Sequence, residues 1–196
     1  KRVKADAERM AERRKFGIAL QFVRAFIKAY SGTGVDEKAR ALLKKIQHRK
    51  TAWELSTLIL QGTLRRGYWQ TDNIRVEKQN HAVRILAGKK EGRLLLAADL
   101  NNATVILRIR RLAGTPVLTI PKTSSKRLIE MASTLFPHGR DVTLKLLIRN
   151  RQLFYWIGTG QNLTPYAPEP IEGTNGLAII LPSGSSLLLL SVRVSR

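Results

Sequence analysis

Hydrophobic residues are spaced in two different ways along this chain, and the spacing changes near Gly67. Over Phe16–Tyr30 they recur every three or four residues, which is typical of an amphipathic helix that begins before Phe16. Ser31–Gly34 should end this helix, because glycine readily takes the left-handed backbone conformation found after helices. The spacing therefore predicts that the chain starts with helical structure.

Two further helices are predicted before the spacing changes. One begins at Asp36, a favourable N-cap residue. The other follows a capping-box pattern at Thr51–Glu54 and ends near Gly62. Residues 1–66 are therefore expected to form a helical extension.

After Gly67, short apolar runs alternate with turn residues, which is typical of β-strands. The predicted strands lie at about Ile74–Lys78, Ala82–Leu86, Arg93–Ala98, Ala103–Leu112, Val117–Ile120, Val142–Arg149, Leu153–Ile157, Leu177–Leu181 and Leu187–Val194. Helical spacing near 124–136 predicts one helical insertion among them. This series of short strands favours a mainly β fold, an antiparallel two-sheet sandwich (jelly roll) over residues 67–196 with the helical extension in front of it.

Alternation within the strands predicts which side chains are buried. In Ala103–Leu112 and Val142–Arg149, apolar residues occupy every second position, and Arg or Lys stands between them. In the last strand leucines occupy both sides, and Leu187 and Leu189 are expected on the outer face. Because an exposed apolar pair needs cover, we expect the apolar side of Phe16–Tyr30 to cover it, within the chain or from a second copy in a homo-oligomer.

Composition adds a strong constraint, because 35 Lys and Arg stand against 14 Asp and Glu, a formal net charge of +21. Solubility alone needs a net charge of only about 2–8 in a small domain, so an acidic partner is expected. The sequence has no cysteine, which excludes disulfides, thiolate metal sites and a cysteine nucleophile. Its apolar runs are far shorter than the roughly 20 residues of a membrane helix, so no membrane span is expected.

Basic residues occur in clusters that could contact the phosphate, sulfate or carboxylate groups of such a partner. The candidate polyanion-binding residues are Arg13, Arg14, Lys15, Lys44, Lys45, Arg65, Arg66, Lys89, Lys90, Arg108, Arg110 and Arg111. Trp69 and Tyr155 are the candidates for stacking against sugars or bases. Alternation requires that either Tyr155 or Trp156 faces the core.

Several segments follow one another in a characteristic order from Gly67 to Val194. They are Gly67–Trp69, Gly92–Leu96, Ala103–Arg110, Val142–Ile148, Leu153–Gly158, Gly176–Leu181 and Leu187–Val194. Their order resembles the concanavalin-like jelly roll of the lectin and laminin-G type. The resemblance implies a two-sheet antiparallel sandwich that binds glycans or proteins, sometimes as a non-catalytic module attached to another domain.

The residues give little sign of catalysis or of a bound metal. Glycosidases need two closely placed carboxyl groups, and the predicted strands are almost free of acids. The three histidines, His48, His81 and His138, lack the local spacing of metal ligands. Asp99 and its neighbours could offer oxygen atoms to calcium, but a turn explains them equally well. No catalytic residue, metal ligand or cofactor is therefore predicted.

The leading hypothesis is a non-catalytic interaction module that binds an acidic polymer or an acidic protein surface, with an anionic glycan favoured. One alternative is a nucleic-acid-associated structural protein, such as a ribonucleoprotein or capsid-like subunit. A second alternative is a carbohydrate-active hydrolase whose acids come from loops, with Glu130, Asp141 and Glu169 as the candidates.

Overall fold

The chain is divided into two compact units, Lys1–Leu55 and Ser56–Arg196. The computed structural model describes residues 2–60, 62–120, 129–160, 162–171 and 174–195. The boundary lies before Gly67, where the spacing of apolar residues changes. Leu58 is fully buried, and its carbonyl accepts a hydrogen bond from the indole nitrogen of Trp69 at 3.1 Å. Residues 56–66, which were predicted to belong to the helical extension, therefore belong to the unit that contains the strands.

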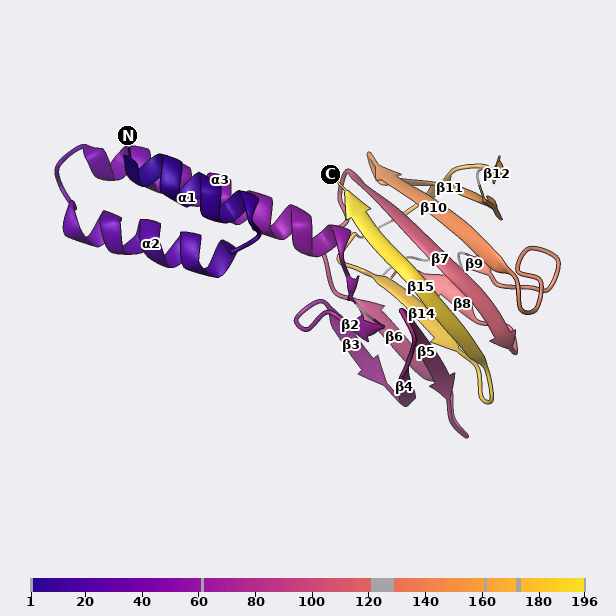
Figure 1. The fold of residues 1–196 in the computed structure, drawn as a ribbon. Coiled ribbons are helices and arrows are strands. Elements are labelled where there is room, and N and C mark those ends of the chain that lie inside the picture. The colour runs from indigo at the N-terminus through magenta and orange to yellow at the C-terminus, as the bar shows by residue number, and fades with distance from the viewer. Residues whose placement is uncertain (1, 61, 121–128, 161, 172–173, 196) are drawn as a thin grey trace. The chain divides into compact units, whose positions relative to one another are not determined.

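Helices form the first unit, and in order they are α1 (Arg2–Glu12), α2 (Phe16–Ala29) and α3 (Val35–Ser56) (Figure 1). The helix predicted over Phe16–Tyr30 is confirmed as α2. The residues before it form a separate helix, because Arg14 takes a positive φ of 59° that interrupts the helical backbone. Within the described ranges, no helix combines the length and the apolar character needed to cross a membrane.

α3 continues without a break through the place where two separate helices were predicted. Leu55 is buried, and Trp53 packs against the core of the helical unit with its ring centroid 5.7 Å from that of Phe16. Burial of these side chains holds the helix together across Thr51–Glu54. Tertiary packing thus outweighs the local capping pattern, as it often does for helices.

The apolar side of α2 is covered within the helical unit itself. Buried residues from all three helices form one core, which consists of Ala7, Ala11, Phe16, Ala19, Leu20, Val23, Ala39, Leu42 and Ile46. The expectation that this side of α2 covers the last strand is therefore wrong, because its side chains already have partners on α1 and α3.

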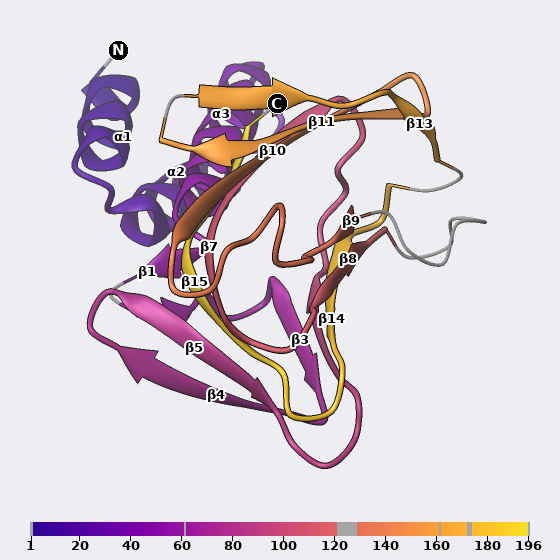
Figure 2. The ribbon, with the colours of Figure 1, turned by 90° about the vertical axis from the view of Figure 1, so that its right-hand side faces the viewer.

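The second unit is a sandwich of two antiparallel sheets, whose layers are visible in Figure 2. In the eight-stranded sheet the order is β12-β11-β10-β7-β15-β5-β4, and β13 pairs with β11. The bounds of these strands are β4 Ile74–Gln79, β5 Ala82–Ala87, β7 Ala103–Ala113, β10 Asp141–Arg149, β11 Gln152–Thr159, β12 Asn162–Pro165, β13 Glu169–Pro170 and β15 Ser186–Ser195.

The five-stranded sheet has the order β3-β6-β14-β8-β9. Its strands are β3 Trp69–Asp72, β6 Gly92–Leu96, β8 Val117–Thr119, β9 Ile129–Glu130 and β14 Leu177–Leu181. A hairpin of β1 (Ile59–Leu60) and β2 (Thr63–Leu64) precedes them. The predicted fold class, a mainly β two-sheet sandwich with an N-terminal helical extension, is confirmed.

Every predicted strand is present, but the predicted helical insertion near 124–136 is wrong in its described part. Ile129 pairs with Leu118 as part of β9, and the amide of Met131 donates to the carbonyl of Pro116 at 2.8 Å. Ile129 and Met131 are both buried, so an alternating strand places the same apolar side chains in the core that a helix would have gathered on one side. Residues 124–128 lie outside the described residues.

β15 corrects the predicted placement of its leucines. Leu187 and Leu189 are fully buried, and Leu189 pairs with the buried Ile109 of β7. A bulge between Leu189 and Ser191 adds a residue, so that these leucines face the core together with Val192. The expected outer pair is therefore wrong, and Leu187 and Leu189 offer no surface for a homo-oligomer.

This orientation can be tested by unfolding. We expect Leu189→Ala to lower the free energy of unfolding by about 2–5 kcal/mol, because it leaves a cavity between the sheets. Leu190→Ala, at a half-buried position, should cost about 1 kcal/mol. Urea unfolding followed by tryptophan fluorescence measures both, and a larger loss for Leu190→Ala would contradict the inward placement of Leu189.

Candidate binding surface on the eight-stranded sheet

The outer face of the eight-stranded sheet, which is turned away from the five-stranded sheet, carries an excess of cations. Buried residues such as Ile109 and Leu144 alternate with outward-facing residues along β7 and β10. Strand register then places the outward residues of neighbouring strands side by side. The charged residues of this face in the described strands are Arg75, Glu77, Arg84, Arg108, Arg110, Asp141, Lys145, Arg149 and Arg193. Seven cations thus stand against two carboxylates.

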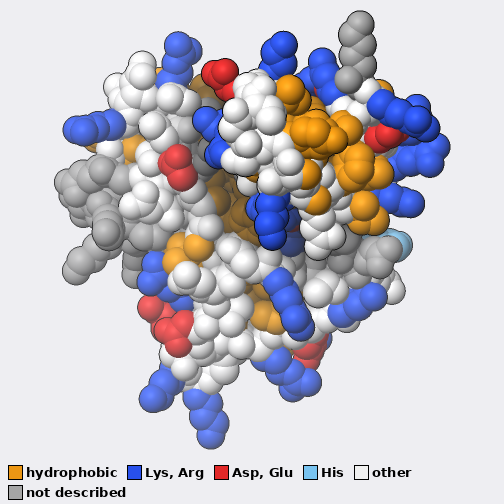
Figure 3. Space-filling view, turned by 90° about the vertical axis from the view of Figure 1, so that its left-hand side faces the viewer, with side chains coloured by type: hydrophobic (Ala, Val, Ile, Leu, Met, Phe, Trp, Pro, Cys, Tyr) orange, Lys and Arg blue, Asp and Glu red, His pale blue; other side chains and the backbone are white. Residues whose placement is uncertain are grey.

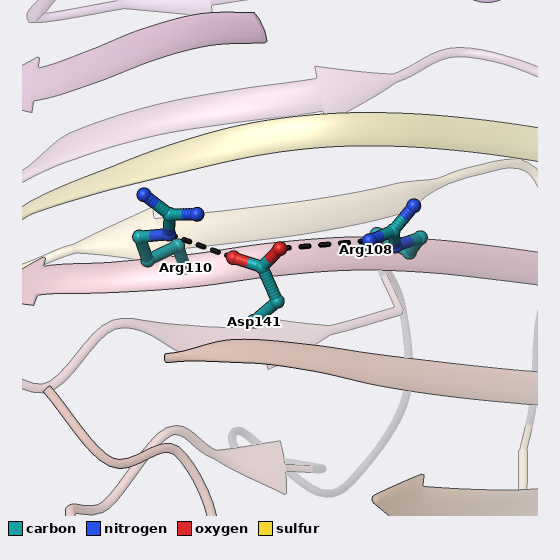
Figure 4. Close-up of polar contacts among 3 residues, drawn as sticks. All are labelled: Arg108, Arg110 and Asp141. Atoms are coloured by element: carbon teal, nitrogen blue, oxygen red, sulfur yellow. Dashed lines mark hydrogen bonds and ion pairs between the residues drawn. The ribbon is translucent and has the colours of Figure 1, made fainter. Parts of the chain in front are cut away.

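Asp141 joins two of these arginines (Figure 4). Its Oδ1 accepts a hydrogen bond from Nε of Arg110 at 2.7 Å, and its Oδ2 lies 3.5 Å from Nη2 of Arg108. The hydrogen bond to Asp141 raises the pKa of Arg110, and the negative charge of Asp141 adds to this effect. One carboxylate therefore holds two guanidinium groups in defined positions and leaves one positive charge in excess.

Glu77 holds two arginines in the same way on the same outer face, on the edge strand β4. Its Oε1 lies 2.9 Å from Nε of Arg75, and its Oε2 lies 3.7 Å from Nη1 of Arg84. Leu188 of β15 lies between the two arrangements, because it pairs with Arg84 on β5 and with Arg110 on β7. Guanidinium groups held in this way keep further N–H donors for sulfate or carboxylate groups.

A cavity of about 280 Å³ opens on the outer face beside Arg110. Its apolar floor comes from Ala82, Leu188 and Leu190, and neutral hydrogen-bonding groups come from the turn that joins β4 to β5, chiefly Asn80. An apolar floor with a polar rim and one cation is suited to a sugar ring that carries an anionic group.

Of the adjacent aromatic residues Tyr155 and Trp156, the structure turns Trp156 to the outer face. Trp156 pairs with Lys145 in the strand register, and the Lys145 ammonium lies 5.1 Å from its ring centroid. Tyr155 shares the core-facing side of β11 with Leu153, and its half-buried ring stacks on Tyr166 with the centroids 5.1 Å apart. Trp156 is thus the better placed aromatic on this face, although the sequence had favoured Tyr155.

The other aromatic candidate, Trp69, already has a structural contact. Its indole nitrogen donates to the carbonyl of Leu58, and its side chain is half-buried on β3, at the edge of the five-stranded sheet. Trp69 therefore lies in a different sheet from Trp156 and Lys145.

The remaining predicted cations of the sandwich fall into two groups. Arg111 donates to the carbonyls of Phe136 at 2.7 Å and Gly114 at 2.8 Å, and Arg65 donates to the carbonyl and hydroxyl of Thr57 at 3.1 and 2.8 Å. These two arginines hold loops in place. Arg66, Lys89 and Lys90 are instead exposed on loops.

The helical unit carries the other predicted cations. Arg13, Arg14 and Lys15 are exposed between α1 and α2, and the Arg14 guanidinium lies 5.9 Å from the ring centroid of Trp53. Lys44 is exposed on α3, whereas Lys45 forms an ion pair with Glu8 at 2.9 Å. Its hydrogen bond lowers the pKa of Glu8.

The acids proposed for a hydrolase do not form a pair. Glu130 lies in the five-stranded sheet, whereas Asp141 and Glu169 lie on β10 and β13 of the other sheet. Both oxygens of Asp141 are engaged by arginines. Glycoside hydrolysis by the usual route needs two carboxyl groups on either side of one bond, so this arrangement does not supply it.

The loop considered for calcium does not fit that ion. Oδ1 of Asp99 accepts a hydrogen bond from the amide of Asn101 at 3.0 Å and another from the hydroxyl of Thr174 at 3.4 Å. The first is the bond of a turn and the second joins this turn to Thr174, whereas calcium takes about six to eight oxygen ligands. Over the described ranges, no group of three or more His, Asp or Glu residues is placed to hold a metal ion.

No family model and no curated protein matches this chain. Among solved structures, the VIP36 exoplasmic/lumenal domain bound to Ca²⁺ and Man3GlcNAc is similar, with 7% identity over 70% of this chain and 86% of that chain and a TM-score of 0.50. The metal-free form of the same domain is 8% identical over 69% of this chain and 89% of that chain, with a TM-score of 0.50. The carbohydrate binding module CBM66 from Bacillus subtilis is 10% identical over 66% of this chain and 96% of that chain, with a TM-score of 0.48.

The similarity to the VIP36 domain concerns the fold. At this level of identity, a shared arrangement of strands says nothing about individual site residues. The resemblance to the concanavalin-like β-sandwich, expected from the order of the segments after Gly67, is confirmed.

The Tyr155 side chain gives a testable dependence on pH. Burial raises its pKa, as do the negative charge of Glu169, the neighbouring Tyr166 and a hydrogen bond to Glu169. A raised pKa means that the folded state favours the neutral phenol. This contribution to stability is complete below the unfolded pKa of about 10 and is lost as the pH rises through the higher folded value.

We therefore expect the free energy of unfolding to fall less steeply in Tyr155→Phe than in the unmodified chain as the pH rises above about 10. Urea unfolding at a series of alkaline pH values measures the two slopes. Parallel curves would show that the phenol of Tyr155 does not contribute in this way.

Proposed function

We propose that the β-sandwich is a non-catalytic module that binds an anionic glycan through the outer face of its eight-stranded sheet. The observation that carries the proposal is the set of seven cations on this face, four of which are held by only two carboxylates. The net charge of +21 adds a long-range attraction for any polyanion.

The arrangement of the arginines favours sulfate and carboxylate groups. A guanidinium is planar and offers paired N–H donors that match such groups, and a fixed guanidinium loses less conformational freedom when it binds. Asp141 and Glu77 provide that fixation for the two pairs of arginines. The same carboxylates repel anions weakly, so binding depends on the surplus of cations around them.

Two further features favour a glycan over other polyanions. Trp156 lies on the outer face beside Lys145, and the cavity beside Arg110 has the apolar floor that the C–H face of a sugar ring requires. The VIP36 domain, which is similar in fold, is described in complexes with Man, Man2 and Man3GlcNAc. That similarity supports a glycan, and the cations of this chain favour an anionic one.

The proposal can be tested with two triple variants of equal charge. The first, Arg108→Gln with Lys145→Gln and Arg193→Gln, removes three cations from the outer face. The matched control, Arg66→Gln with Lys89→Gln and Lys90→Gln, removes three exposed cations from loops of the same unit. Dissociation constants for heparin, measured over a series of salt concentrations, compare the two.

We expect the outer-face variant to bind heparin at least about tenfold more weakly than the control variant. The slope of log Kd against the logarithm of the salt concentration should also decrease by about one for each lost contact. Equal weakening in both variants would overturn the assignment of the surface. Tighter binding of a single-stranded RNA of matched charge than of heparin would overturn the choice of glycan.

A further inference from the structure

A cavity in the helical unit differs in chemistry from the surface described above. It has a volume of about 320 Å³ and lies between the three helices. Most of its lining is apolar, and the residues concerned are Val3, Val23, Phe26, Val35, Ala39 and Leu42. Val23 is fully buried and Ala39 and Leu42 nearly so, which places them at its floor. Such a lining offers nothing to the hydroxyl groups of a sugar.

Two cations complete the lining, Lys4 on α1 and Lys38 on α3, and both are exposed. Among the described residues, none that lines the cavity is an acid. Glu8, four residues after Lys4, is bonded to Lys45 at 2.9 Å, and Asp36, two residues before Lys38, lies 3.8 Å from Arg40. The carboxylates of Glu8 and Asp36 are thus engaged by other cations.

The surroundings of the cavity are also partly apolar. Val35 is 47% exposed, and Tyr30, five residues before it, is 49% exposed. In Figure 3 the largest group of hydrophobic side chains on the face shown has Lys and Arg side chains at its border, and smaller hydrophobic groups lie elsewhere on that face. An exposed apolar patch of this kind indicates a site for a ligand or partner, and the cations at its border select for negative charge.

We propose that this cavity binds a single-chain fatty carboxylate, whose acyl chain lies between the three helices and whose head group lies between Lys4 and Lys38. The volume is near the lower end of the range for small-molecule sites, about 300–1,000 Å³, which suits one chain rather than two. Apolar lining with a few placed polar groups is the usual composition of such sites. This site is independent of the glycan surface, because every residue in it belongs to the helical unit.

Chain length provides the first test. Titration calorimetry of the full chain with octanoate, decanoate and dodecanoate, each below its micelle concentration, should give an affinity that rises about fourfold per added methylene. Neutral alcohols of the same lengths should bind more weakly. An affinity that does not change with chain length, or that is the same for alcohol and carboxylate, would overturn the proposal.

Charge provides the second test. Lys4→Gln with Lys38→Gln should weaken dodecanoate binding about fivefold and leave dodecanol binding unchanged, because each exposed ion pair contributes modestly. The matched control, Lys28→Gln with Lys44→Gln, removes two exposed lysines of the same unit that do not line the cavity. Equal weakening in both double variants would mean that only the net charge of the unit affects binding, and it would contradict a head-group site between Lys4 and Lys38.

Filling the cavity separates this ligand from a protein partner. Ala39→Leu should extend a side chain into the space and abolish dodecanoate binding, and an unchanged circular dichroism spectrum and heparin affinity would show that both units still fold. Dodecanoate binding that survives unchanged in Ala39→Leu would overturn the proposal. Self-association that dodecanoate does not reverse, measured by sedimentation, would instead assign the patch to a second copy of the chain.

Discussion

The pairing of β15 with β7 and of β7 with β10 determines both faces of the eight-stranded sheet. On the inner face it aligns Leu189 with Ile109 and Leu107 with Leu144, which closes the core. On the outer face the same register sets Arg110 beside Asp141. Because a slip of one residue would exchange the two faces, burial of the leucines is also what holds the cations outward.

The arginines of the outer face combine fixation with surplus charge. A surface arginine alone is mobile, and its ion pairs contribute little to stability. Here each carboxylate is shared by two guanidinium groups, as Asp141 is by Arg108 and Arg110. The result is a surface that remains positive while several of its donors have defined positions, which suits recognition of a polymer with regularly placed anionic groups.

The two units divide the chemistry of the chain. The sandwich presents a broad, charged face with a small polar-rimmed cavity beside Arg110. The helical unit has a largely apolar cavity whose lining includes the exposed lysines Lys4 and Lys38. Both carry positive charge, so the net charge of the chain does not distinguish them. The two cavities differ in what lies beneath their cations. The cavity beside Arg110 lies on the surface of a sheet, whereas the cavity of the helical unit lies between three helices.

Period-two alternation and turn residues were enough to determine the strands and the sandwich, and the count of charged side chains predicted an acidic partner. They also placed Lys145 outward, since it stands between the apolar residues of β10. Tertiary structure decided the side of Leu187, where a bulge shifts the alternation, and the side of Trp156, which follows from its pairing with Lys145. Local sequence shows that side chains alternate between the two faces of a strand. Which set of side chains faces the core depends on the pairing with the partner strand and on which face of the sheet is buried.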